Sequence, residues 1–194
     1  GECNAIPAAL KGNGNFRQTK HSGHNLSDYF QYILESYYNL PGEVGFIKGN
    51  IFPRHISRAV FLKRIDTAGF IPLYSDERTF SPKYQRIIRF RLILQQIAPG
   101  LCVEFNNNWY CKYRKEGQFY KKFDDLFFHI FNRDAPRYNI FVPGACMIVP
   151  AVNIRRWPYD LFQHLYDITT YTHFPVEAFH VERMMFYLFG APLE

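Results

Sequence analysis

Apolar side chains recur at every third or fourth position in several segments, which is the pattern of helices that bury one face. The clearest segment has apolar side chains at Phe123, Leu126, Phe127, Ile130 and Phe131. The same spacing predicts helices over residues 27–39, 56–66, 124–132, 158–168 and 177–189. Residues 82–98 fit both the helical and the strand period, and we assign them to a helix that carries Arg86 and Arg89.

Short continuous apolar runs lie between these helices and predict buried strands. They are EVGFIKGN (43–50), GFIPLYS (69–75) and YNIFVPGACMIV (138–149), the last with a Pro-Gly interruption. Strands that alternate with helices predict one α/β domain over residues 1–194, with a mixed, mostly parallel central sheet flanked by helices. Ligands of such sheets bind outside the carboxyl ends of the strands.

The sequence CVEFNNNWYC, residues 102–111, predicts a hairpin with Asn106 and Asn107 in its turn. In that hairpin Cys102 and Cys111 would lie opposite each other, as the partners of a cross-strand disulfide do. No secretory segment opens the sequence, so we expect the two thiols to be reduced.

Composition narrows the function classes. The net charge of +6 favours an anionic partner such as a nucleotide diphosphate, a nucleic acid or an anionic membrane. The aromatic share of 19% suits either a heavy core or surfaces that stack on sugars and bases. No apolar run reaches the ~18 residues of a membrane helix, so we expect no transmembrane segment. The chain lacks GxSxG, HExxH, P-loop and GxGxxG motifs, which disfavours the enzyme classes that those motifs mark.

Polar residues after the first predicted strand form a candidate binding site. Lys48 and Asn50 offer hydrogen-bond donors, and Gly49 allows a ligand to approach the backbone closely. Arg54 follows near a predicted helix start, where anions bind. These features suit a phosphate or a sugar hydroxyl, and an ordinary solvated turn explains them equally well.

A second functional hypothesis comes from residues 109–122, where basic residues alternate with aromatic ones. This pattern occurs in grooves that bind single-stranded nucleic acid. The hypothesis is a non-catalytic basic and aromatic module that binds single-stranded nucleic acid or a glycan. A solvated hairpin is the simpler explanation of the same residues.

Glu182 lies in the stretch AFHVERMMFYLFG (178–190), which is otherwise mostly aromatic and Met. Helical spacing places it on one face with Phe179, Met185, Phe186 and Phe189. A carboxylate on an apolar face costs free energy unless it is paired or used. It is either a general base with a raised pKa or a helix-start charge paired with a cation such as Arg183.

Three blocks of the sequence together resemble a family of small GT-A-like glycosyltransferase domains from bacteria, fungi and large DNA viruses. The first block is HSGHNLSDYFQYILESYYNLPGEVGFIKGN (21–50). The second is VPGACMIVPAVNIRRWPYDLFQHLYD (142–167), and the third is VERMMFYLFG (181–190). The blocks cover about half of the chain, and residues 65–135 carry little resemblance.

The resemblance implies a GT-A-like fold and transfer of a sugar from a nucleotide-diphosphate-sugar donor to a glycan or lipid-linked acceptor. It implies that Glu182 is the general base, and a single base suits inversion at the anomeric carbon. The donor-binding residues would be Lys48, Gly49, Asn50, Arg54, Arg86 and Arg89. The acceptor side would be formed by Gly144, Ala145, Cys146 and His180. Nucleic acid is not a partner in this interpretation.

The metal requirement is left open by the sequence. Many GT-A enzymes hold Mn²⁺ or Mg²⁺ with an Asp-x-Asp motif at a strand end, and this chain has Lys48-Gly49-Asn50 there. Lys48 can offset diphosphate charge without a metal, or the ligands lie elsewhere, for example at Asp66, Asp76 or Glu77. We expect a location in the cytoplasm of a bacterium or of a virus-infected host cell, with peripheral membrane contact left open.

Overall fold

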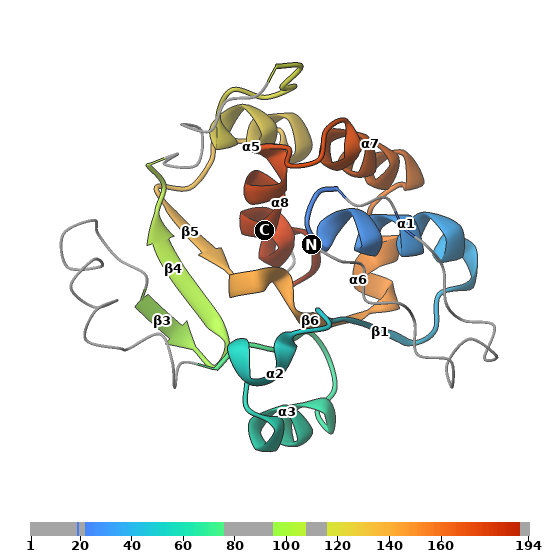
Figure 1. The fold of residues 1–194 in the computed structure, drawn as a ribbon, viewed down its shortest axis with the longest axis vertical. Helices are drawn as coiled ribbons and strands as arrows, with labels where there is room; N and C mark the ends of the chain where they lie inside the picture. The colour runs from blue at the N-terminus through green and yellow to red at the C-terminus, as the bar shows by residue number, and fades with distance from the viewer. Residues whose placement is uncertain (1–18, 20–21, 76–94, 108–115, 191–194) are drawn as a thin grey trace.

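A computed structural model describes residues 19, 22–75, 95–107 and 116–190 (Figure 1). The described residues form two small sheets surrounded by helices. The first sheet has the strand order β1 (Glu43–Phe46), β6 (Met147–Pro150), β2 (Ile71–Pro72). The second has the order β3 (Gln95–Ala98), β4 (Leu101–Phe105), β5 (Tyr138–Phe141). Mixed α/β composition is therefore confirmed.

Five of the helices in the described ranges agree closely with those predicted from apolar spacing, whereas the two short ones, at 51–54 and 151–155, were not predicted. The helices of these ranges are α1 (Leu26–Ser36), α2 (Ile51–Arg54), α3 (Arg58–Ile65), α5 (Phe123–Phe131), α6 (Ala151–Arg155), α7 (Tyr159–Thr170) and α8 (Glu177–Phe189). A short 3-10 segment, η2 (Tyr37–Asn39), extends α1, and another, η5 (Pro143–Ala145), joins β5 to β6. No helix in these ranges combines the length and apolarity needed to cross a membrane.

The expectation of a mostly parallel sheet is wrong, because every strand pair in both sheets is antiparallel. β1 and β2 do run in the same direction and are joined through α2 and α3, as strand–helix–strand alternation predicts. However, β6 is inserted between them and runs the opposite way. The Pro-Gly interruption divides the predicted strand 138–149 into two strands. β5 ends before it in one sheet, and β6 begins after it in the other.

The expected environment of Cys102 is also wrong. β4 is the middle strand of its sheet, and Cys102 lies opposite Gln96 on one side and Phe141 on the other. Its side chain is buried, and Cys111 lies outside the described residues. Residues 95–98, predicted as the end of a helix, form β3 instead, while Arg86 and Arg89 lie outside the described residues.

Helix α8 is the element on which the other layers pack. It contacts β5, α7, α5, α6 and α1 and lies at the centre of the view in Figure 1. Val181, Met184, Met185, Leu188 and Phe189 are fully buried, and each such side chain contributes roughly 1.5–3 kcal/mol to folding. One buried cluster joins this helix to residues of both sheets.

Glu177 fixes the start of α8 although its side chain is completely buried. Its Oε1 accepts hydrogen bonds from the backbone N–H groups of Phe119 (2.7 Å) and Tyr120 (3.1 Å). Its Oε2 accepts from the hydroxyl of Tyr171 at 2.9 Å. Burial and this hydrogen bond raise the pKa of Tyr171. Three donors therefore satisfy a buried carboxylate that would otherwise be very costly.

Replacing Glu177 should destabilise the protein strongly. Glu177→Ala leaves two backbone N–H groups and the Tyr171 hydroxyl without their acceptor, and we expect a loss of about 3 kcal/mol in the free energy of unfolding. Glu177→Gln keeps one acceptor oxygen and should lose less. Urea denaturation followed by circular dichroism measures both, with the exposed Glu116→Ala as a control. An effect no larger than that of the control would contradict this role.

Candidate functional site

The turn η5 between the two sheets is the centre of the candidate site. Gly144 has φ = 79° and Ala145 has φ = 52°, both in the left-handed region. Glycine adopts this region without strain, whereas a non-glycine residue there is uncommon. The sequence analysis predicted a strand at these positions, and the tight turn corrects that prediction. Both residues are buried.

The side chain of Glu182 accepts a hydrogen bond from the backbone of this turn. Its Oε1 accepts a hydrogen bond from the N–H of Gly144 at 2.9 Å. Its Oε2 lies 3.9 Å from a guanidinium nitrogen of Arg183, at the outer limit of an ion pair. Arg183 bonds more closely to Glu104, with 2.7 Å between Nε and Oε1. Because 23% of the Glu182 side chain is exposed and a carboxylate accepts several hydrogen bonds, Glu182 keeps capacity for a ligand.

The position of Glu182 on α8 separates two roles that the sequence analysis left open. The helix starts at Glu177, so Glu182 lies in the second turn and is not the acidic residue at the helix start. Glu177 occupies that position and is fully engaged with its three donors. The half-buried rings of Phe179 and Phe186 lie one turn before and one turn after Glu182, as helical spacing predicts.

Two imidazole rings, those of His24 and His55, lie close enough to Glu182 for its charge to influence their pKa values. A Cβ atom on Gly144 would lie 2.6 Å from the ring of His55, so the absence of a side chain there makes room for this imidazole. The ring of His24 packs against Phe174 and Phe179, at centroid distances of 5.5 and 5.3 Å. Burial lowers the pKa of both histidines, and nearby Lys48 lowers it further, while Glu182 opposes the shift. Neutral imidazoles are therefore favoured near pH 7.

Cys146 and Tyr29 close the site on the side of the core. Cys146 is completely buried, and burial raises the pKa of its thiol while Lys48 opposes that shift. The Tyr29 hydroxyl lies beside this thiol, and burial together with Cys146 raises the pKa of Tyr29. A thiol with a raised pKa is a poor nucleophile. Cys146 therefore forms part of the wall of the site.

The residues predicted to bind a donor lie at the end of β1. Lys48 is half-buried and close enough to His24, His55 and Cys146 to influence their pKa values. Gly49 and Asn50 are exposed in the turn that follows, and Arg54 is exposed at the end of α2. Of the predicted donor-binding residues at this strand end, the structure thus brings Lys48 to the candidate site, whereas Gly49, Asn50 and Arg54 lie on the exposed surface.

His180, predicted to lie on the acceptor side, is separated from Glu182 by the geometry of α8. It is 0% exposed, and its ring lies edge-on to Phe123, with centroids 6.4 Å apart. Burial, followed by the charge of Arg183, lowers its pKa to about 3. Its side chain points into the core and not toward the turn at Gly144.

A metal site is not evident among the residues that the structure describes, since no group of three or more His, Cys, Asp or Glu side chains converges there. Asp66 is exposed at the end of α3. Asp76 and Glu77 lie outside the described ranges. The arrangement at Gly144 offers a different chemistry, in which an oriented carboxylate accepts a proton beside neutral imidazoles and a lysine.

Sequence reasoning missed His24, Tyr29 and the structural role of Glu177. The signal for His24 was present, because the run Ser22-Gly23-His24-Asn25 directly precedes a predicted helix. Gly23 and His24 both have positive φ, 62° and 57°. That turn directs His24 toward Phe179 on α8. Nothing in the spacing of Tyr29 distinguishes it from an ordinary core residue of α1.

Comparison of the chain with protein families, with curated proteins and with solved structures finds no match.

The turn at Gly144 should not tolerate a side chain. In Gly144→Ala the new Cβ would meet His55 at 2.6 Å on a backbone with φ = 79°, and we expect a loss of roughly 1–3 kcal/mol in stability. Gly49→Ala is the matched control, because a Cβ there would meet nothing within 4 Å. Urea denaturation of both variants tests this, and equal stability would contradict the packing of His55 on Gly144.

Burial of His180 should make stability depend on pH. The unfolded chain binds a proton at this residue below its ordinary pKa of 6.5, whereas the folded chain does so only near 3. Stability is therefore fully present above pH 6.5 and is lost as the pH falls. Between pH 7 and 5 the contribution is about 2 kcal/mol. In His180→Gln this part of the pH dependence should disappear from urea titrations, whereas the exposed His129→Gln should retain it. An unchanged slope in His180→Gln would refute the prediction.

Proposed function

We propose that the protein transfers a sugar from a nucleotide-diphosphate-sugar donor to an acceptor hydroxyl, with Glu182 as the general base. One observation carries the proposal. The three sequence blocks that resemble glycosyltransferase domains lie far apart in the chain, yet their polar residues meet at the turn η5. His24 and Lys48 come from the first block, Gly144 and Cys146 from the second, and Glu182 from the third.

The geometry of Glu182 supports the role of a base. The N–H of Gly144 holds one carboxylate oxygen at 2.9 Å, which orients the group. Hydrophobic rings before and after it on α8 reduce its contact with water. A general base must be oriented within hydrogen-bond reach of the proton that it removes. The long 3.9 Å separation from Arg183 leaves the carboxylate available for that proton.

The proposed reaction is a single displacement. The acceptor oxygen forms a bond to the anomeric carbon of the donor sugar as its proton moves to Glu182. The bond between the anomeric carbon and the diphosphate oxygen breaks, and the nucleoside diphosphate leaves with the electron pair. Lys48 supplies positive charge for the departing group, with Arg54 further out. Attack opposite to the leaving group inverts the anomeric centre.

A panel of nucleotides and nucleotide sugars tests donor binding. Each is added to the protein with and without Mn²⁺ or Mg²⁺, and thermal unfolding is recorded. A ligand that binds only the folded state raises the melting temperature by mass action. We expect one nucleotide base to be preferred and its sugar diphosphate to give the largest shift. No shift with any member of the panel would refute the proposed function.

The Glu182→Gln variant tests the chemical step. The amide has almost the same shape but cannot accept the proton, so donor binding should persist while transfer falls by about 10²–10⁴-fold. Glu116→Gln, an exposed carboxylate, is the matched control and should retain full activity. Transfer is measured as release of nucleoside diphosphate with the preferred donor. Full activity of Glu182→Gln would remove Glu182 from the mechanism.

A further inference from the structure

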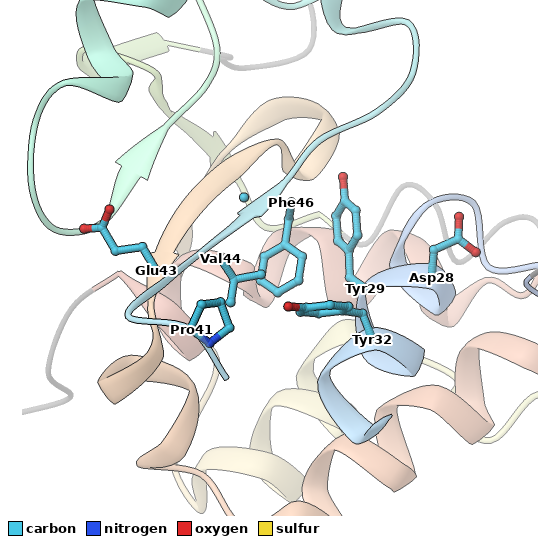
Figure 2. Close-up of a pocket in the computed structure, with 8 residues that line it drawn as sticks. Asp28, Tyr29, Tyr32, Pro41, Glu43, Val44 and Phe46 are labelled. Carbon is cyan, nitrogen blue, oxygen red and sulfur yellow. The ribbon is translucent and has the colours of Figure 1, made fainter. Parts of the chain in front are cut away.

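A pocket of about 350 Å³ lies between α1 and the edge of β1 (Figure 2). Its walls are aromatic and apolar, formed by Tyr29, Tyr32, Pro41, Val44 and Phe46. The rings of Tyr29 and Phe46 contact each other at a centroid distance of 4.8 Å. In Figure 2 the ring of Tyr32 extends across the pocket toward Phe46 and Val44. Tyr32 is 41% exposed and so presents a ring to a ligand.

The edge of β1 adds backbone groups to this pocket. In an antiparallel pair, alternate residues direct their N–H and C=O groups toward the partner strand and away from it. The N–H of Ala151 donates to the C=O of Gly42. The backbone N–H and C=O groups of Val44 and Phe46 therefore point toward β6, and those of Gly45 point away from it. Gly45 lines the pocket and is exposed. A ligand on the Tyr32 side can therefore bond to both a donor and an acceptor of the main chain.

The charged residues of this pocket differ in sign from those at the predicted donor-binding end of β1. Asp28 and Glu43 lie among the lining residues, and none of those in the described part of the chain is basic. Lys48 and Arg54, in contrast, follow the opposite end of β1. An anionic diphosphate is thus favoured at the carboxyl end of β1 and disfavoured at the pocket. Aromatic rings combined with backbone donors and acceptors suit the apolar faces and hydroxyl groups of a sugar.

We infer that this pocket binds a neutral or amine-bearing sugar of the acceptor, at a position remote from the reacting hydroxyl. Tyr29 connects the two places, because its ring lines the pocket and its hydroxyl lies beside Cys146 at the core side of the site. Its role as an acceptor subsite rests on the proposed function. The binding of a sugar in this pocket does not rest on the proposed function, so experiments can refute either one without the other.

Binding is tested on the full chain by NMR titration with four trisaccharides. Maltotriose and chitotriose are neutral, the chitosan trimer is cationic, and trigalacturonate is anionic. At least one of the first three should shift the amide signals of Tyr32, Val44 and Gly45, and trigalacturonate should bind about tenfold more weakly or not at all. No binding by any trimer, shifts confined to other residues, or tightest binding of trigalacturonate would overturn the inference.

Variants of Tyr32 identify the ring as the binding surface. Tyr32→Ala should lower the affinity for the trimer that binds by about tenfold or more. Tyr32→Phe keeps the ring, and its affinity should stay within about twofold of the wild type. Tyr38→Ala is the matched control, because Tyr38 is an exposed tyrosine of the neighbouring segment that does not line the pocket. Equal affinity of Tyr32→Ala and the wild type would overturn the inference.

Transfer assays separate this inference from the proposed function. With an acceptor in use, Tyr32→Ala should raise KM for the acceptor at least about fivefold and leave the donor-induced thermal shift unchanged. If a trimer binds in a way that depends on Tyr32 but no nucleotide sugar binds, the proposed transfer is refuted and the sugar-binding pocket stands. Glu182-dependent transfer with an unchanged acceptor KM in Tyr32→Ala would refute the pocket and keep transfer.

Discussion

The turn at Pro143–Ala145 is the constraint on which the candidate site depends. It is the central part of the connection, residues 142–146, that carries the chain from the second sheet to the first, and Gly144 and Ala145 in it have positive φ. Only a backbone of this shape directs the N–H of Gly144 toward α8, where it bonds to Glu182. The absence of a side chain at Gly144 also admits the ring of His55. One turn therefore orders a carboxylate from the C-terminal helix and an imidazole from the segment after β1.

Much of the secondary structure could be predicted from the sequence, because helices with one buried face have a strong periodic signal. The stripes that begin at Phe30 and Phe123 gave α1 and α5 nearly to the residue. The positions of β1, β2, β5 and β6 were also predicted, since short apolar runs between helices have few other interpretations, whereas β3 was predicted as the end of a helix. Strand direction was not predicted. Whether β6 pairs with β1 and β2 depends on contacts between residues 75 (Pro72 with Met147) to 107 (Glu43 with Pro150) positions apart, and no local pattern records them.

The candidate site was predicted only in part, for a similar reason. Glu182 and Lys48 could be found from their positions at a helix face and a strand end. His24 was missed: the turn before α1 could be read from Gly23, but the contact of His24 with Phe179 exists only after α1 and α8 pack. His180 shows the reverse error. His180 lies two residues before Glu182, and a spacing of two on a helix does not place side chains on one face. In α8 it places His180 in the core beside Phe123.

The distribution of charge along β1 gives the site a direction. The carboxylate of Glu43 begins this short strand, whereas the cations of Lys48 and Arg54 follow its carboxyl end. An anionic ligand and a neutral or cationic ligand are thereby attracted to opposite ends of one rigid element. The proposed transfer between two bound substrates would use this separation, because each substrate must be excluded from the binding place of the other. Helix α8 lies against the same sheet through Phe46 and Phe189, so Glu182 is held at a fixed position relative to both ends.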